Sequence, residues 1–150
     1  MFAKIQTAIA AKLQAHPGFP AQMKIIAREE KDVENDILAA VAKLGICLYV
    51  MPLLPLRCLP TENNIIFFES VEIRVRVIED PLLAKRLGFG VYDGMAATML
   101  ALQGFSPLDA NGEPLFAAPL GLAATPVSFV EDEETRIADV IFNVALQLQP

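Results

Sequence analysis

IIFFESVEIRVRVIE, residues 65–79, is the stretch that decides the fold. Its second half alternates strictly between apolar and charged residues. Apolar side chains share one face, and charged side chains share the other: Val71, Ile73, Val75 and Val77 against Glu72, Arg74 and Arg76. A period of two predicts a strand with one side on a core and one polar side. At roughly 14 residues it is long against a usual length of about 5–6.

Three helices are predicted around this strand, over residues 2–14, 33–44 and 92–103. Apolar residues recur in each at spacings of three and four, which is typical of a helix with one buried side. His16 and the Pro17–Gly18 pair end the first helix. Asp32 is the expected N-cap of the second helix, and Gly45 stands where a C′ residue belongs. We therefore expect each helix to pack one face on the sheet.

Shorter strands are predicted at residues 23–28 and 46–51, followed by an irregular or edge passage with prolines at 52, 55 and 60. Residues 105–121 form a loop. A closing hairpin is expected from residues 127–130 and 137–148. The whole chain, residues 1–150, is thus predicted to be one α+β domain. Its sheet is expected to be mostly antiparallel, with about four to five strands and helices packed on one face.

Composition limits the classes of partner. The net charge of −6 disfavours binding to phosphate backbones, so we expect no specific nucleic-acid partner. The longest apolar run, residues 45–56, is too short for a membrane span and contains two prolines. No apolar run at the N-terminus resembles a signal peptide, which favours a cytoplasmic protein. Hydrophobic residues make up 54% of the chain, and this surplus fits either an interface or an alanine-rich core.

No catalytic, cofactor-binding or metal-binding residues are predicted. His16 is the only histidine. It lies at the C-terminal end of a helix, where interaction with the helix dipole is a sufficient structural role. Cys47 and Cys58 have no second pair to complete a zinc site, so buried free thiols are expected. Residues 88–94, GFGVYDG, lack the spacing of a nucleotide loop and indicate a turn before a helix. Glu69, Glu72, Glu79 and Asp80 lie on or beside the strand that carries Arg74 and Arg76, which predicts ion pairs rather than acid–base chemistry.

The charged face of the long strand is the candidate interaction surface. Its residues Glu72, Arg74 and Arg76 are suited to contacts between like subunits, and so are Glu131 and Glu133 in the charged turn of the hairpin. Simple solvation of the same charges is the alternative explanation.

Three segments, in this order, resemble the tail terminator (tail completion) proteins of tailed bacteriophages and prophages. They are the helix that runs from Asp32 to Leu44–Gly45, the strand VEIRVRVIEDP at residues 71–81, and LQGFSP at residues 102–107, which precedes the closing hairpin. The resemblance covers most of the chain and rests on element order. It implies a structural subunit without an active site or cofactor. Such a subunit forms a homo-oligomeric ring on the tail tube and meets other tail or connector proteins.

The resemblance also implies assembly in the host cytoplasm, a final place in the virion tail, and ring contacts through the long strand and loop 105–121. Two other hypotheses stay open. The chain is alternatively a small bacterial binding or adaptor module that uses its apolar surplus for a heterologous protein partner. An enzyme would need convergent titratable groups in a cleft, and the sequence does not predict such a group.

Overall fold

The computed structural model describes residues 1–27, 32–59, 65–132 and 134–148. The elements follow the order α1 (Phe2–Ala15), β1 (Ile25–Ile26), α2 (Val33–Leu44), β2 (Ile46–Val50), β3 (Leu54–Leu59), β4 (Ile66–Glu79), α3 (Pro81–Leu87), α4 (Val91–Leu102), β5 (Gly121–Glu131) and β6 (Arg136–Leu148). The predicted α+β class with a mostly antiparallel sheet is confirmed, and the described residues contain six strands.

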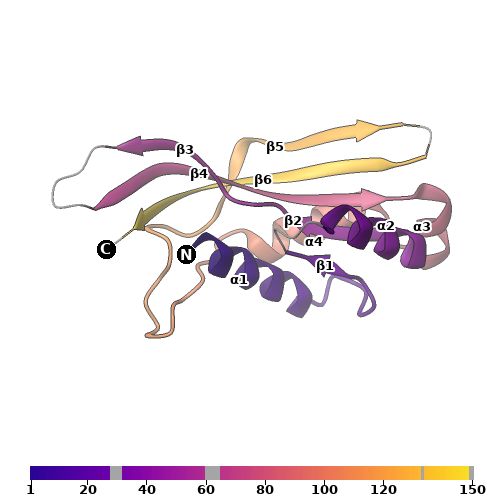
Figure 1. Ribbon diagram of the computed structural model, residues 1–150. Helices are drawn as coiled ribbons and strands as arrows, with labels where there is room; N and C mark the ends of the chain where they lie inside the picture. The colour runs from indigo at the N-terminus through magenta and orange to yellow at the C-terminus, as the bar shows by residue number, and fades with distance from the viewer. Residues whose placement is uncertain (28–31, 60–64, 133, 149–150) are drawn as a thin grey trace.

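All six strands form one sheet in the order β1-β2-β4-β6-β5, with β3 paired to β4 (Figure 1). Strand β4 is its centre. The half of β4 near Glu79 pairs with β2, and the half near Ile66 pairs with β3, so β2 and β3 follow one another along the same edge. Strand β6 pairs along the other edge of β4, from Ile66 opposite Leu148 to Glu79 opposite Arg136. Among the strands of the described residues, only β1 and β2 run parallel.

The main core lies between the sheet and helices α1 and α4. Its β4 members are Val71, Ile73, Val75 and Val77, each with 0% exposure. Alternate residues of β6 join them, namely Ala138, Val140, Phe142, Val144 and Leu146. Helix α1 contributes Ile5, Ile9 and Leu13. Burial of each large apolar side chain stabilises the fold by about 1.5–3 kcal/mol, so this face holds the domain together.

Helix α2 packs on the opposite face of the sheet, whereas α1 and α4 lie together on the face just described. A small second cluster of Ile26, Ala40, Cys47 and Ile78 fixes α2 there. The predicted packing of the helices on one face is therefore wrong for α2, because periodicity predicts that a helix has a buried stripe but not which face of the sheet receives it. Burial raises the pKa of the Cys47 thiol to about 12. Cys47 is therefore the buried thiol that the sequence predicts, whereas Cys58 is exposed.

Helix ends follow the predicted signals. Helix α1 ends at Ala15, just before His16, and α2 begins after Asp32, although the Asp32 side chain makes no capping hydrogen bond. Gly45 ends α2 with a φ of +87°, in the left-handed region that glycine tolerates best. The predicted short strand over residues 23–28 is reduced to Ile25–Ile26 in the described residues, and residue 28 lies outside them.

Helix α3 is an element that the sequence pattern did not predict. Asp80 and Pro81 end β4, as expected, and they also start a helix. The Asp80 side chain accepts hydrogen bonds from the backbone N–H groups of Leu82 and Leu83, and Pro81 occupies the first turn. Both features favour a helix N-terminus. At seven residues, α3 is too short for apolar periodicity to reveal it.

Strand β3 and the first residues of β4, Leu54–Leu59 and residues 66–70, form an extension that we call the arm. Figure 1 shows the arm projecting past the helices. Bulges interrupt its pairing between residues 55 and 58, which fits the predicted irregular or edge character of this passage. The Phe68 ring, 6.2 Å from the Phe2 ring, links the arm to α1. Leu54, Leu56 and Ile66 remain 53%, 53% and 46% exposed.

We expect Gly45→Ala to destabilise the protein much more than Gly112→Ala. Both glycines have positive φ, +87° and +83°. Either substitution therefore costs about 1–2 kcal/mol of left-handed strain. Only at Gly45 would the new Cβ also meet backbone atoms, with the Ala84 nitrogen at 2.3 Å, whereas nothing lies within 4 Å at Gly112. Urea unfolding measures both losses, and equal losses would contradict the close packing of α2 on α3.

Candidate functional site

Four charged residues form a ladder on the sheet face opposite the main core. Glu72, Arg74 and Arg76 point there because they alternate with the buried residues of β4. Asp139 reaches the same face from β6, since the register places it directly opposite Arg76. We call these four residues the charged ladder.

The ladder is built around a nearly buried carboxylate. Asp139 accepts two hydrogen bonds from Arg76, at 2.8 Å from Nε to Oδ1 and 3.0 Å from Nη2 to Oδ2. Arg74 adds a longer contact of 3.4 Å from Nη1 to Oδ2 and also donates to Glu72. Only 6% of the Asp139 side chain is exposed. The hydrogen bond to Asp139 raises the pKa of Arg76, and that to Glu72 raises the pKa of Arg74.

Three of the predicted contact residues are thus brought together, but as partners of one another. Two cations and two anions make the ladder neutral, and its bidentate pair is the strong geometry for arginine and carboxylate. The side chains of Arg74 and Arg76 keep 37% and 34% exposure. A partner protein would therefore meet the exposed sides of two guanidinium groups that are already paired with carboxylates.

The hairpin turn is ordered by its own hydrogen bonds. Glu131 accepts from Arg136 at 2.7 Å. Asp132 Oδ1 accepts from the backbone N–H groups of Glu134 and Thr135, at 2.9 and 2.7 Å. The Thr135 bond is the first cause of a lowered Asp132 pKa. Glu133, the other predicted contact residue here, lies outside the described residues. The structure does not bring this turn together with the ladder in a single site.

The remaining carboxylates considered for chemistry also have structural partners. Glu69 pairs across strands with Arg57 at 3.0 Å, and Asp80 caps α3. Glu79 is 4% exposed and accepts a hydrogen bond from the Val91 backbone N–H at the start of α4. Its other oxygen lies 3.7 Å from Arg136. Ion pairing, as the sequence predicts, therefore accounts for Glu69 and Glu79, and capping accounts for Asp80.

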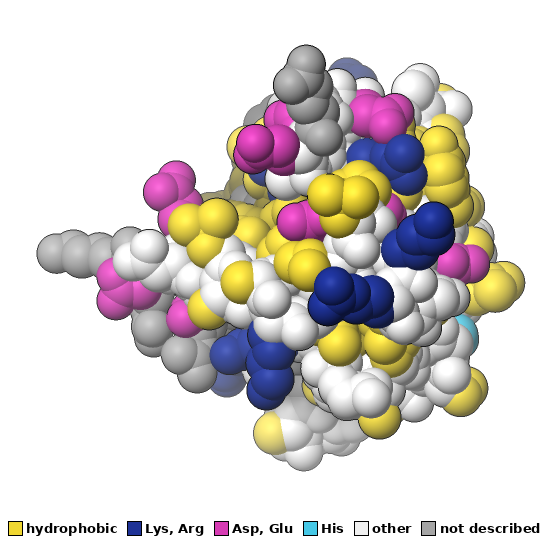
Figure 2. Space-filling view, turned by 90° about the vertical axis from the view of Figure 1, so that its right-hand side faces the viewer, with side chains coloured by type: hydrophobic (Ala, Val, Ile, Leu, Met, Phe, Trp, Pro, Cys, Tyr) yellow, Lys and Arg dark blue, Asp and Glu magenta, His cyan; other side chains and the backbone are white. Residues whose placement is uncertain are grey.

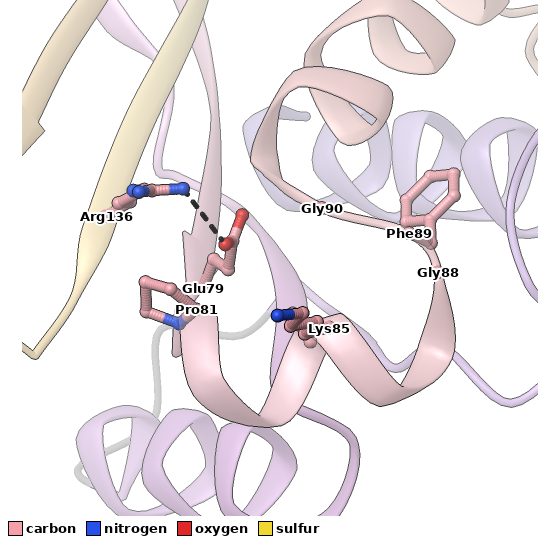
Figure 3. Close-up of a pocket in the computed structure, with 8 residues that line it drawn as sticks. Glu79, Pro81, Lys85, Gly88, Phe89, Gly90 and Arg136 are labelled. Atoms are coloured by element: carbon pink, nitrogen blue, oxygen red, sulfur yellow. Dashed lines mark ion pairs between the residues drawn. The ribbon is translucent and has the colours of Figure 1, made fainter.

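A hollow of about 440 Å³ adjoins Glu79 (Figure 3). It is lined by Glu79, Pro81, Ala84, Lys85, Gly88, Phe89, Gly90 and Arg136. Gly88 ends α3 and Gly90 precedes α4, so the glycine-rich segment connects two helices. The chain's own carboxylate occupies the N-terminus of α4, where an anion would otherwise bind. Glu79, the carboxylate among these lining residues, is therefore engaged by the Val91 N–H and by Arg136.

The end of the molecule that carries α2 and α3 has a mixed surface. Figure 2 shows Lys and Arg side chains beside hydrophobic ones on this end. Exposed Lys43, Lys85 and Arg86 accompany Leu38 and Leu82, which are 66% and 83% exposed. Scattered charges and leucines of this kind are consistent with a solvated surface.

No three His, Cys, Asp or Glu side chains in the described part of the chain are grouped so as to hold a metal ion. Among residues 1–27, 32–59, 65–132 and 134–148, no helix is long and apolar enough to cross a membrane.

Sequence reasoning missed Asp139 as the centre of the ladder and Arg136 as a link between Glu79 and Glu131. Both lie in β6, far along the chain from their partners. An aspartate in a mostly apolar strand was the available signal at residue 139, but its partner depends on strand register.

Comparison of the chain with protein-family models gives no match, and comparison with curated proteins gives none either.

We expect Arg76→Ala to lower the free energy of unfolding by about 3 kcal/mol, because a buried carboxylate that loses its partner is left uncompensated. The matched control is Arg57→Ala. It breaks a pair whose side chains are 70% and 47% exposed, and exposed pairs contribute at most about 1 kcal/mol. Denaturant unfolding of both variants decides the matter. Similar small losses would show that Arg74 or water fully replaces Arg76 at Asp139.

Proposed function

We propose that the protein is a structural subunit of a bacteriophage or prophage tail that works as a tail terminator. Copies assemble into a ring on the end of the tail tube, stop its growth and present a face to the head or connector. The proposal draws on the resemblance in element order described above. One structural observation supports it most, namely that the sheet extends beyond its helical cover.

The arm is that extension. In the arm, residues 67 and 68 of β4 pair with β3 on one side and with the end of β6 on the other, and such a sheet is stabilised when its apolar side chains pack against another surface. Three large apolar side chains of the arm, Leu54, Leu56 and Ile66, are about half exposed within a single copy. Exposed apolar side chains gathered on one projecting element are typical of a protein–protein contact. A neighbouring subunit or the tail tube would cover them.

Charge is compatible with the same role. The net charge of −6 repels phosphate groups, so a ring of such subunits would not retain DNA that passes through it. The charged ladder has no net charge, so the repulsion comes from charges elsewhere on the surface.

The biological test is deletion of the gene from a strain that produces the tails. Without a terminator, tubes should grow past their normal length and fail to join heads, because nothing caps the growing end. Electron microscopy of lysates measures tube length, and a plasmid copy of the gene is the control for the deletion. Tails of normal length and normal head attachment in the deletion strain would refute the proposed function.

We expect Leu56→Glu to reduce assembly at least about tenfold, since it places a charge on an apolar contact surface, and about 1.4 kcal/mol suffices for that factor. Leu82→Glu is the control, because Leu82 is also exposed to solvent, at 83% against 53% for Leu56, but lies on α3, away from the arm. Light scattering over a concentration series, repeated with tail tubes present, measures assembly. Equal assembly by both variants would exclude the arm as a contact surface in assembly. A wild-type chain that binds only an unrelated protein would favour the adaptor alternative.

A further inference from the structure

Strand β5 lies at the margin of the helical layer that α1 and α4 form on one face of the sheet. Helix α1 contacts β1 and β2, and α4 contacts β4 and β6. Strand β5 comes next in the sheet after β6. The described helical layer therefore ends one strand before the sheet does.

Two contacts define how α4 lies relative to β5. At one end the rings of Tyr92 and Phe129 stack, with centroids 5.9 Å apart and planes within 13°. At the other end the Leu122 backbone N–H donates to Gln103 Oε1 at 3.0 Å. Ala96 and Met99 fall on the same side of α4, four and seven residues after Tyr92. We call Tyr92, Ala96, Met99, Leu122 and Phe129 the shelf.

The shelf is apolar and partly open. Tyr92, Leu122 and Phe129 are 65%, 37% and 38% exposed, and neighbouring Leu100 is 77% exposed. Asp93 is the only charged residue among the twelve of α4. A helix that is apolar nearly all round is usually buried on all sides. The outer side of α4 therefore calls for a further cover, which a single copy does not supply among its described residues.

The distribution of charge along the chain indicates which surface would cover the outer side of α4. Residues 87–135 contain seven acidic residues and no Lys or Arg, whereas residues 1–28 contain four Lys or Arg and no acidic residue. Of the described residues, Asp93 lies on α4, and Glu131, Asp132 and Glu134 lie at the hairpin turn, whereas Asp109 and Glu113 lie in the loop between α4 and β5. Lys4 and Lys12 lie on α1. Oppositely charged surfaces of this kind steer association and set its register.

Helix α1 stands on the far side of the molecule from β5 (Figure 1). Within one copy, α1 contacts α4, and Lys12 lies 5.4 Å from the Phe105 ring. The outer side of α1 points elsewhere and exposes Ala3, Lys4, Thr7 and Ala11. Short side chains there permit close approach of a second surface, and Lys4 supplies a cation.

We propose that the shelf of one copy receives the outer side of α1 from a second copy, which continues the helical layer from subunit to subunit. This inference rests on the proposed self-assembly and names the two surfaces involved. Because they lie on opposite flanks, the contact is head-to-tail, and repeating it around a rotation axis closes a ring. The arm is free to make a separate contact with the tube or a neighbour.

Cysteine cross-linking tests this contact in the full chain. In a Cys58→Ser background, Ala96→Cys protein is mixed with Ala11→Cys protein and oxidised. The control mixture replaces the second partner with Ala39→Cys, an exposed α2 position. Because α2 packs on the opposite face of the sheet, we expect the first mixture to form inter-chain disulfides at least about tenfold faster. Equal rates would overturn the inference.

Charge variants separate this inference from the proposed function. Ala96→Glu and Lys4→Glu should each reduce assembly at least about tenfold, with Ala39→Glu as the matched control. Added salt should weaken the wild-type contact, because the charges are at the surface. Full assembly by Ala96→Glu and Lys4→Glu would refute the shelf contact while self-assembly stands. A chain that neither assembles nor cross-links above the control, even with tail tubes, would contradict both.

Discussion

The pairing of β4 with β6 is the interaction on which the rest of the structure depends. One register places Val75 opposite Val140 in the core layer and Arg76 opposite Asp139 on the open face. Because side chains alternate with a period of two, a slip by one residue would exchange the two faces. The apolar residues would then meet water, and the charged ladder would enter the core. Core and ladder are therefore two consequences of a single alignment.

Buried carboxylates make that alignment more specific than apolar packing alone. Asp139 and Glu79 are each 4% exposed and depend on arginines of a neighbouring strand. Loss of either partner would leave a buried charge, which costs several kcal/mol. Glu79 also holds the start of α4 through the Val91 N–H, so the position of that helix follows the same pairing. The shelf beside β5 is thus placed by the centre of the sheet.

Local patterns predicted the elements better than their partners. Alternation located β4, and Gly45 located the end of α2, because both signals lie within a few residues. Helix α3 was missed because its only strong marker, Asp80–Pro81, also ends a strand. The side chains of the ladder were predicted on β4, but their central partner lies 63 residues from Arg76 and depends on register. The face that α2 covers likewise depends on how α1 and α4 fill the other side.

The free edges of the sheet bear on how copies meet. Strand β5 carries Pro126 within an irregular stretch between Leu122 and Val127, and β3 carries Pro55 beside a bulge. Prolines and bulges make an edge a poor template for another strand. Sheet-to-sheet continuation is therefore disfavoured along β3 and β5, and the ladder has already paired its charges internally. Side-chain surfaces beside the edges remain, which are the apolar arm along β3 and the apolar shelf along β5. Contacts through such surfaces join subunits by side-chain packing and charge, without adding strands to the edges of the sheet.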